Sequence, residues 1–451
     1  MSQMESVRGD GQTVPASELT GAVRFRPVDR TSVGSVLHAV ARPRLFWGDA
    51  TTAIVAGGTA AMIRADGHDR FETVRDGAEE LYDGLAVPMG TEHDARPRLF
   101  GGFAFHQGHV EPGVEETWHG YPGARFVLPS IQLTMTADGA WLTAAATGAD
   151  ADARAEDVLD EWEDRLASLP AFEHEGRPGI VAKHPTPSKE GWRKQVTAAT
   201  EKVRRGDLRK VVLAQSLAVD LHRPIDVPSA LGRLGETYPD CFRFLFEPAV
   251  GGTFFGATPE RLVTLEGKTV QTEALAGSTG RGDTQEEDEW LAAELHGSEK
   301  DVHEHELVVE AIRDQLAPLA ADITAGSRMI RKLDTVQHLQ TPIRAELNRD
   351  THVLSLVEAL HPTPAVGGLP PDDALRTIRE TEAFDRGWYA SPIGWLDADG
   401  NGTFAVAIRS ALAADDTATL FAGAGIVGDS DPDEEYDELQ LKYGPMLDEL
   451  E

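Results

Sequence analysis

The chain has 451 residues, and its 75 acidic against 42 basic residues give a formal net charge of −33, which disfavours nucleic acid and anionic membranes as partners. Cys241 is the only cysteine, so an internal disulfide and a thiolate metal cluster are both excluded. There is no run of about 18 apolar residues, and the first residues lack the apolar core of a signal peptide, so we expect a soluble cytoplasmic protein.

Residues 1–182 are expected to form a β-rich first half. Segments 44–58, 96–108 and 124–146 are short apolar stretches bounded by glycine, proline or aspartate-glycine turns, a pattern typical of antiparallel sheet. Residues 151–169 predict a helix, and 173–191 predict a loop-rich connection. The tetrapeptide HPTP within that connection is assigned no function.

Residues 183–451 mix strands and helices without strict alternation, which predicts an α+β architecture. Ser188 is a plausible N-cap for a helix that Gly206 ends, and the valine-rich run 208–219 predicts a buried strand. Hairpins are expected around Glu266 and around residues 397–402. Further helices are predicted at 286–296, 301–317, 353–360, 372–384 and 433–449. Length alone suggests about three domains, but the alternative is that the two halves count as one structural domain.

The segment HPTPAVGG at 361–368 is a constrained loop. Its prolines fix φ, and Gly367 and Gly368 allow backbone N–H groups to approach a ligand. A surface turn between helices is the alternative for any such loop taken alone. The loop is followed in order by YASPIGW, FAVAIRS, AGAGIV and ELQLK, the last beginning at Glu438.

This ordered series resembles the chorismate-utilising enzymes and, among them, the isochorismate synthases. The resemblance is dense over about residues 188–448 and weaker upstream. It implies a two-layer α+β fold in which two stacked antiparallel sheets are flanked by helices. It also implies conversion of chorismate to isochorismate, in which water adds at ring C2 and the C4 hydroxyl leaves.

Two residues are the candidate catalytic groups. Lys210 lies in the apolar strand run, where a solvent-facing strand end is the alternative, and Glu260 follows a Gly-Ala-Thr-Pro turn, where a first-turn helix glutamate is the alternative. The resemblance implies that the lysine of the KVVLA block activates water. It implies that the glutamate of the PERL block protonates the departing hydroxyl.

Most carboxylates here are expected to be solvated surface, because acidic residues are spread along the chain and lysine is scarce. This composition is typical of adaptation to high salt, where charges are screened over about 3 Å at 1 M. Against that background the resemblance implies that Glu304 and Glu438 hold Mg²⁺, with Asp301 and Glu435 binding through water. His305 is interpreted as structural.

The substrate-binding residues are predicted partly from chemistry and partly from the resemblance. Small-residue turns can offer N–H groups to a carboxylate, and an arginine can grip one with a bidentate fork. The predicted set is Gly277, Ser278, His338, Ala365, Val366, Tyr389, Arg409, Gly423, Gly425 and Lys442.

The sequence departs from the family pattern at Gln215, where arginine is common, and at Leu439, where threonine is common. Rival members are salicylate synthase and component I of anthranilate or aminodeoxychorismate synthase, which tend to carry threonine where this chain has Ala365. A non-catalytic, salt-adapted acidic binding protein is the alternative from another class. The resemblance implies a monomer whose product enters menaquinone or siderophore biosynthesis. The salt-adapted composition favours menaquinone.

Overall fold

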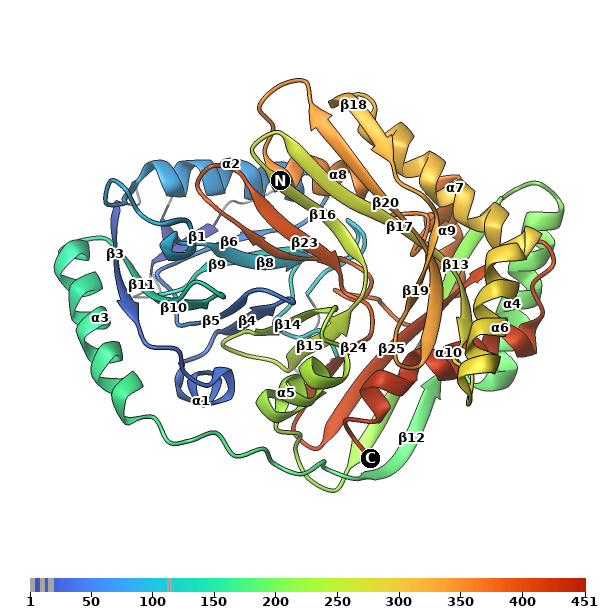
Figure 1. Ribbon diagram of the computed structural model, residues 1–451, viewed down its shortest axis with the longest axis horizontal. Coiled ribbons are helices and arrows are strands. Elements are labelled where there is room, and N and C mark those ends of the chain that lie inside the picture. Colours follow the sequence, from blue (N-terminus) through green and yellow to red (C-terminus); the bar gives the residue numbers. More distant parts are fainter. Residues whose placement is uncertain (1–4, 9–12, 15–19, 112, 114–115) are drawn as a thin grey trace.

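The protein is built on two large β-sheets stacked face to face with helices on the outside (Figure 1). The computed structural model describes residues 5–8, 13–14, 20–111, 113 and 116–451. Within those residues the strand pairs are antiparallel except for one parallel pair between Gly21–Val28 and Leu85–Ala86. The predicted α+β fold with two stacked antiparallel sheets is confirmed.

The first sheet has 12 strands in the described part of the chain. In spatial order they are β18 (Ala320–Ala325), β20 (Val336–Leu347), β17 (Thr269–Gly280), β16 (Arg261–Glu266), β23 (Gly402–Val406), β22 (Pro392–Leu396), β8 (Leu99–Phe103), β9 (Ala124–Leu128), β6 (Ala61–Ala65), β1 (Glu5–Arg8) and β2 (Thr13–Val14), with β19 (Met329–Lys332) beside β20.

The second sheet has 13 strands in the same described residues. In spatial order they are β12 (Ile180–Thr186), β13 (Lys210–Leu221), β25 (Thr417–Ile426), β24 (Ser410–Ala414), β15 (Thr253–Thr258), β14 (Phe242–Glu247), β4 (Arg44–Gly48), β5 (Ala53–Gly57), β10 (Ile131–Met135), β11 (Ala140–Thr147), β3 (Gly21–Val28) and β7 (Leu85–Ala86), with β21 (Gly368–Leu369) beside β13.

The helices pack on the outside of these sheets. They are α1 (Val33–Ala39), α2 (Arg70–Asp83), α3 (Ala151–Ser168), α4 (Lys189–Arg204), α5 (Val227–Thr237), α6 (Gln285–Gly297), α7 (Glu299–Leu316), α8 (Val353–Leu360), α9 (Pro371–Thr381) and α10 (Pro432–Leu447), with a 3₁₀ turn at His93–Ala95. Figure 1 shows α3 along the outer edge of one end, and α4, α6, α7 and α10 at the opposite end around β13, β17 and β25.

Both sheets run through both halves of the chain. Strand β22 of the second half pairs with β8 of the first, and β14 pairs with β4 in the same way. Between α3 and β12 the chain runs along the lower edge of the view to the far end of the molecule (Figure 1). The two halves therefore share one continuous backbone hydrogen-bond framework.

Helix ends follow local capping chemistry where the sequence signal is strong. Ser188 accepts a hydrogen bond from the Gly191 N–H at the start of α4, and Gly206 lies just beyond its end at φ +81°. Helix α8 has the predicted bounds. Helix α9 ends at Thr381 rather than at residue 384, because the Glu382 side chain turns inward to accept a hydrogen bond from the Ala214 N–H.

Two other expectations need correction. The connection 173–191 contains strand β12, an edge strand that pairs only with β13 in the described residues and whose side chains are largely exposed, so its sequence carries little apolar signal. Helix α2 was missed in a half expected to be β-rich, although Phe71, Val74, Ala78 and Leu81 form a buried face at helical spacing. No helix in the described part of the chain is both long and apolar enough to cross a bilayer.

Helix α3 illustrates how part of the acidic surface is balanced. Arg24 and Arg26 of β3 reach across it, and the Arg26 guanidinium contacts Glu156 at 2.6 Å and Asp160 at 3.0 Å. These pairs are largely exposed, so each stabilises the fold little. With a net charge of −33, repulsion among the remaining carboxylates is the larger electrostatic effect.

We therefore expect salt to stabilise the fold. Raising KCl from about 0.1 M to about 1 M shortens the Debye length from about 10 Å to about 3 Å and screens carboxylate repulsion, so Tm measured by circular dichroism should rise by several degrees. Most of the rise should come at the lower concentrations, because screening saturates whereas solute exclusion grows steadily. A Tm that falls with added KCl would contradict this expectation.

Candidate active site

A cavity of about 490 Å³ brings together side chains from β13, β17, β20, β25, α7, α10 and the loops between them. All the residues predicted for catalysis, substrate binding or metal binding line it: Lys210, Glu260, Gly277, Ser278, Asp301, Glu304, His338, Ala365, Val366, Tyr389, Arg409, Gly423, Gly425, Glu435, Glu438 and Lys442. Their roles stay predictions, but their convergence from distant parts of the chain defines one site.

Lys210 is the first residue of β13, and its side chain is only 2% exposed, so the alternative of a solvent-facing lysine is wrong. Its Nζ donates to Glu304 Oε1 at 2.6 Å. Gly425, in the neighbouring strand β25, pairs with Val212, and a Cβ on Gly425 would fall 2.8 Å from Lys210 Cε and 3.1 Å from Glu304 Oε1. The ion pair therefore occupies the space that a side chain at position 425 would need.

Glu260 lies in the turn between β15 and β16, so the alternative of a first-turn helix residue is wrong. Its backbone N–H donates to Thr258 Oγ1 at 3.2 Å, and Thr363 Oγ1 donates to its carboxylate at 3.4 Å. Burial, together with the nearby Glu273 carboxylate, raises the pKa of Glu260 to about 7. A carboxyl group with that pKa can carry a proton near neutral pH and act as a general acid.

Six carboxyl residues line the cavity from α7 and α10: Asp301, Glu304, Glu434, Glu435, Asp437 and Glu438. Glu304 contacts Lys210, and Glu438 contacts Lys442 Nζ at 2.7 Å. Burial raises the pKa of Asp301. Burial and then the Glu438 charge raise the pKa of Glu435. The Glu438 charge therefore disfavours ionisation of Glu435, whereas Lys442 lowers the pKa of Glu438 despite its burial.

This donor set fits a hard divalent cation with an incomplete protein shell. In the described part of the chain, no three histidine, cysteine, aspartate or glutamate side chains are arranged to hold a metal by themselves. Mg²⁺ usually takes one or two carboxylates and completes its shell with water and substrate oxygens. Glu304 and Glu438 can supply those carboxylates, and a cation between the two helices would relieve the crowding.

Gly277, Ser278 and His338 form one wall of the cavity. Gly277 has φ +75° and sits at a bulge where β17 shifts register against β20, so the predicted turn is a strand bulge. Ser278 Oγ lies 2.8 Å from His338 Nδ1, and the buried His338 Nε2 has no partner among the described residues. Burial and then Arg409 and Lys442 hold the pKa of His338 well below its usual value, so the imidazole is neutral.

Arg409 is a buried cation at φ +50°, a left-handed conformation that a bulky residue rarely adopts. Its carbonyl accepts a hydrogen bond from the Ala257 N–H at 3.1 Å, which holds the backbone there. Within the described residues its guanidinium makes no hydrogen bond or ion pair. A strained, unpaired guanidinium in a cavity indicates an anion-binding position.

The segment AGAGIV is part of strand β25 and not the turn that its glycines predicted. Lys442 Nζ donates to the Gly423 carbonyl at 2.8 Å, so that carbonyl points away from the neighbouring strand β13. The N–H of the same residue faces the same edge, as does the N–H of Gly425 two residues on. Strand β24 pairs only as far as Phe421, which leaves this edge facing the cavity.

The paired glycines of the 361–368 loop were expected to offer N–H groups to a ligand, and this is wrong for Gly367, whose N–H donates to the Thr363 carbonyl at 2.9 Å. Gly368 has φ +135°, and a Cβ there would lie 2.4 Å from the Lys210 carbonyl oxygen. These glycines pack the loop onto β13. Ala365 and Val366 are its residues that line the cavity as predicted.

Sequence reasoning missed the ion pair that supports this loop. Arg386 is paired with Glu382, and its guanidinium donates to the Val366 and Val212 carbonyls at 2.9 and 2.8 Å. The Glu382 carboxylate accepts from the Ala214 N–H at 2.8 Å. The available sequence signal was the i,i+4 spacing of Glu382 and Arg386. In a chain this acidic, such spacing is common and does not identify a buried ion pair.

The two departures from the family pattern lie outside the cavity lining. Gln215 is buried, and its Nε2 donates to the Pro187 carbonyl at 2.7 Å. Leu439 is fully buried in α10. Both side chains are buried outside the cavity lining.

Comparisons with known proteins agree with this geometry. Residues 11–451 match the family described as "Chorismate binding enzyme". Isochorismate synthase MenF of Bacillus subtilis (strain 168) is 36% identical over 427 residues, which cover 90% of this chain and 88% of the relative. The salicylate biosynthesis isochorismate synthase of Pseudomonas aeruginosa is 36% identical over 99% of this chain and 93% of the relative.

Two solved structures share the fold. The menaquinone-specific isochorismate synthase MenF of Escherichia coli has a TM-score of 0.79 at 24% identity and covers 100% of this chain and 96% of that one. A putative 2,3-dihydroxybenzoate-specific isochorismate synthase, DhbC from Bacillus anthracis, has a TM-score of 0.73 at 28% identity and covers 92% and 98%. On the family match and these relatives, the chain belongs to the chorismate-binding enzymes.

Proposed function

We propose that this protein is an isochorismate synthase, which converts chorismate to isochorismate by adding water at ring C2 and releasing the C4 hydroxyl. The observation that carries the proposal is a single cavity that holds a buried lysine, a glutamate whose pKa is raised to about 7 and an unpaired buried arginine. Relatives with this activity in their names align over most of the chain, which supports it.

Lys210 and Glu260 divide the proton transfers. After it gives up the proton held in its ion pair with Glu304, the Lys210 amine takes a proton from the attacking water as the water oxygen bonds to C2. Both ring double bonds shift, the C4–O bond breaks, and protonated Glu260 gives its proton to the departing hydroxyl, which leaves as water. Attack and departure occur at different ring atoms, so the acid and base come from different elements, the β15–β16 turn and β13.

The other residues hold the substrate and keep water ordered. Arg409 grips one carboxylate of the dianionic substrate, and the N–H edge of Gly423 and Gly425 faces another polar group. Bound Mg²⁺, held by Glu304 and Glu438, would neutralise the ring carboxylate; Asp301 and Glu435 are the proposed water-mediated contacts. Neutral His338 offers its unpartnered Nε2 to the substrate.

Within the family, Ala365 favours isochorismate as the released product over the aminated or pyruvate-eliminated products of the rival enzymes. We propose a cytoplasmic monomer whose product enters menaquinone biosynthesis. Siderophore biosynthesis is the alternative destination, because both pathways begin with this step. An acidic binding protein without catalysis would leave the buried Lys210 and the raised pKa of Glu260 without a role.

Product analysis tests the proposal directly. Incubation with chorismate and Mg²⁺, with and without ammonia, should give isochorismate alone, separated by liquid chromatography. A chelator should abolish turnover, and added Mg²⁺ should restore it. Salicylate with pyruvate, or an ammonia-dependent product, would replace the assignment with a rival enzyme, and no conversion in any condition would favour the binding protein.

Removing either proposed proton-transfer group should leave a folded but nearly inactive protein. Lys210→Ala and Glu260→Gln should each lower kcat by about 100-fold or more, the usual size of a general acid or base effect. Lys183→Ala and Glu266→Gln are matched controls, because both side chains are exposed and outside the cavity. Near-normal turnover in Lys210→Ala or Glu260→Gln, with unchanged circular dichroism, would remove that residue from the mechanism.

The pH dependence should carry the signature of Glu260. The acid must be protonated to act, and its pKa in the folded protein is raised from 4.5 to about 7. As far as Glu260 is concerned, kcat/KM should therefore be at its maximum below pH about 7, and it should fall as the pH rises through that value. The residual activity of Glu260→Gln should not show this fall near pH 7. If the fall persists, it belongs to another titrating group.

A further inference from the structure

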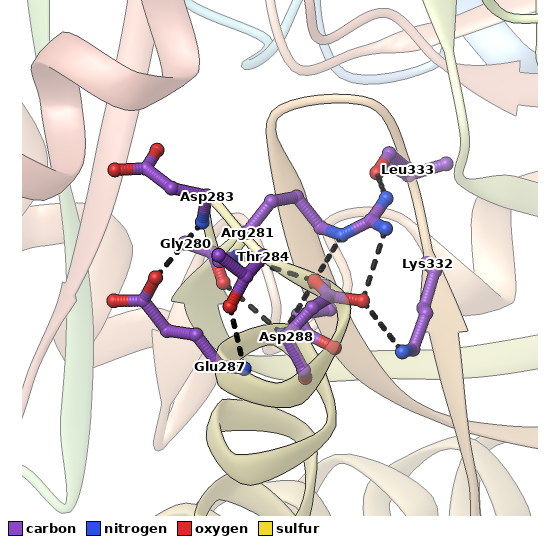
Figure 2. Close-up of polar contacts among 10 residues, drawn as sticks. Gly280, Arg281, Asp283, Thr284, Glu287, Asp288, Lys332 and Leu333 are labelled. Carbon is purple, nitrogen blue, oxygen red and sulfur yellow. Dashed lines mark hydrogen bonds and ion pairs between the residues drawn. The ribbon is translucent and has the colours of Figure 1, made fainter.

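Asp288, on the first turn of α6, is the centre of a polar cluster outside the cavity (Figure 2). Its carboxylate accepts from the Arg281 Nε and Nη2, from Lys332 Nζ at 2.6 Å and from the Gly282 N–H at 3.2 Å. The side chain is only 9% exposed. Hydrogen bonds from Arg281 and then Lys332 hold its pKa well below the usual range, so it stays ionised.

Helix α6 depends on this carboxylate because it has almost no hydrophobic face. Its buried residues are Asp288 and Leu295, while Trp290 is 60% exposed. A surface helix normally packs against its sheet through an apolar stripe that contains about three residues in every two turns. Here polar contacts at one residue take the place of that stripe.

The cluster joins three segments. Arg281, just beyond β17, also donates to the Leu333 carbonyl in the turn between β19 and β20. Gln337 of β20 donates to the Gly280 carbonyl at 3.2 Å and to the Asp288 carbonyl at 3.3 Å. A Cβ on Gly282 would lie 2.3 Å from the Asp288 nitrogen, so the chain after β17 is pressed onto α6.

The joined segments carry one wall of the cavity. In the register of β17 with β20, Ser278 lies opposite His338, and Gly280 lies opposite Val336; all four line the cavity. Asp288 does not line it. The cluster therefore holds the two strands together within a few residues of the Ser278–His338 hydrogen bond, at the end of β17 where the ladder stops.

We propose that Asp288 is a positioning residue that, through Arg281 and Lys332, holds Ser278 and His338 in the geometry that binds the substrate. The expected change in KM rests on the proposed function. The expected loosening of the cavity wall rests on geometry alone. Without the carboxylate, Arg281 and Lys332 face each other unpaired, and the ends of β17 and β20 and helix α6 loosen. Binding weakens because the wall is no longer preorganised.

Two variants test it, beside one matched control and one variant that restores the charge. Asp288→Asn keeps the shape and removes the charge, and Lys332→Met removes one partner at a partly exposed position. Glu289→Gln removes a neighbouring exposed carboxylate that accepts a hydrogen bond from Gln285 and touches neither Arg281 nor Lys332. Asp288→Glu restores the charge with a longer side chain and should recover part of the lost function.

Asp288→Asn should raise KM for chorismate by about tenfold with kcat within about threefold, the pattern of lost ground-state and transition-state binding alike. Lys332→Met should raise KM by less, and Glu289→Gln should match the wild type. Hydrogen exchange of the substrate-free protein should quicken in residues 278–297 and stay unchanged in β13 and β25. Should Asp288→Asn fail to fold, Lys332→Met still gives both readouts.

Unchanged kinetics in Asp288→Asn and Lys332→Met would overturn the proposal, as would a lower Tm at unchanged KM, because either result would leave Asp288 only a structural part. A fall in kcat at constant KM would also overturn it. Absence of turnover in the wild-type protein would instead refute the proposed function. The exchange comparison would still decide whether Asp288 holds the wall, since it needs no substrate.

Discussion

The buried ion pair between Lys210 and Glu304 is the contact around which the cavity is built. It joins β13, in the second sheet, to α7, which packs on β17 of the first. Desolvating two charges is costly unless the geometry is fixed, and it is fixed here by β25 and β21 on the two sides of β13. This pair requires glycine at positions 368 and 425. A Cβ at 368 would collide with the Lys210 backbone, and a Cβ at 425 would collide with its side chain.

The environment gives chemically identical carboxyl groups different protonation. Glu304 and Glu438 each contact a lysine, whereas burial and a carboxylate neighbour raise the pKa of Glu260 and Glu435. The two lysine cations and the protons on the carboxyl groups therefore reduce the negative charge of the cavity before any ligand binds. Such separation of pKa values is what lets one site carry out acid and base steps.

Local chemistry in the sequence predicted much of the fold, and the order of motifs predicted the site. Helices with a side-chain cap and a glycine stop, such as α4, were found because capping is local. The sequence did not predict strand β12, because an edge strand forms through backbone pairing with its neighbour and does not require an apolar pattern. Asp288 and Arg386 act on groups 44 and 174 positions away, and no local pattern identifies such partners.

The 361–368 loop acts through shape more than through hydrogen bonds. The carbonyls of Val366 and Gly367 and the N–H of Gly367 are bonded within the protein, and Thr363 turns to Glu260. What the loop shows to the cavity is therefore the apolar side chains of Ala365 and Val366. These two side chains add no donor or acceptor, so in the proposed reaction the polar lining residues, Lys210 and Glu260 among them, must orient the nucleophile and the leaving group.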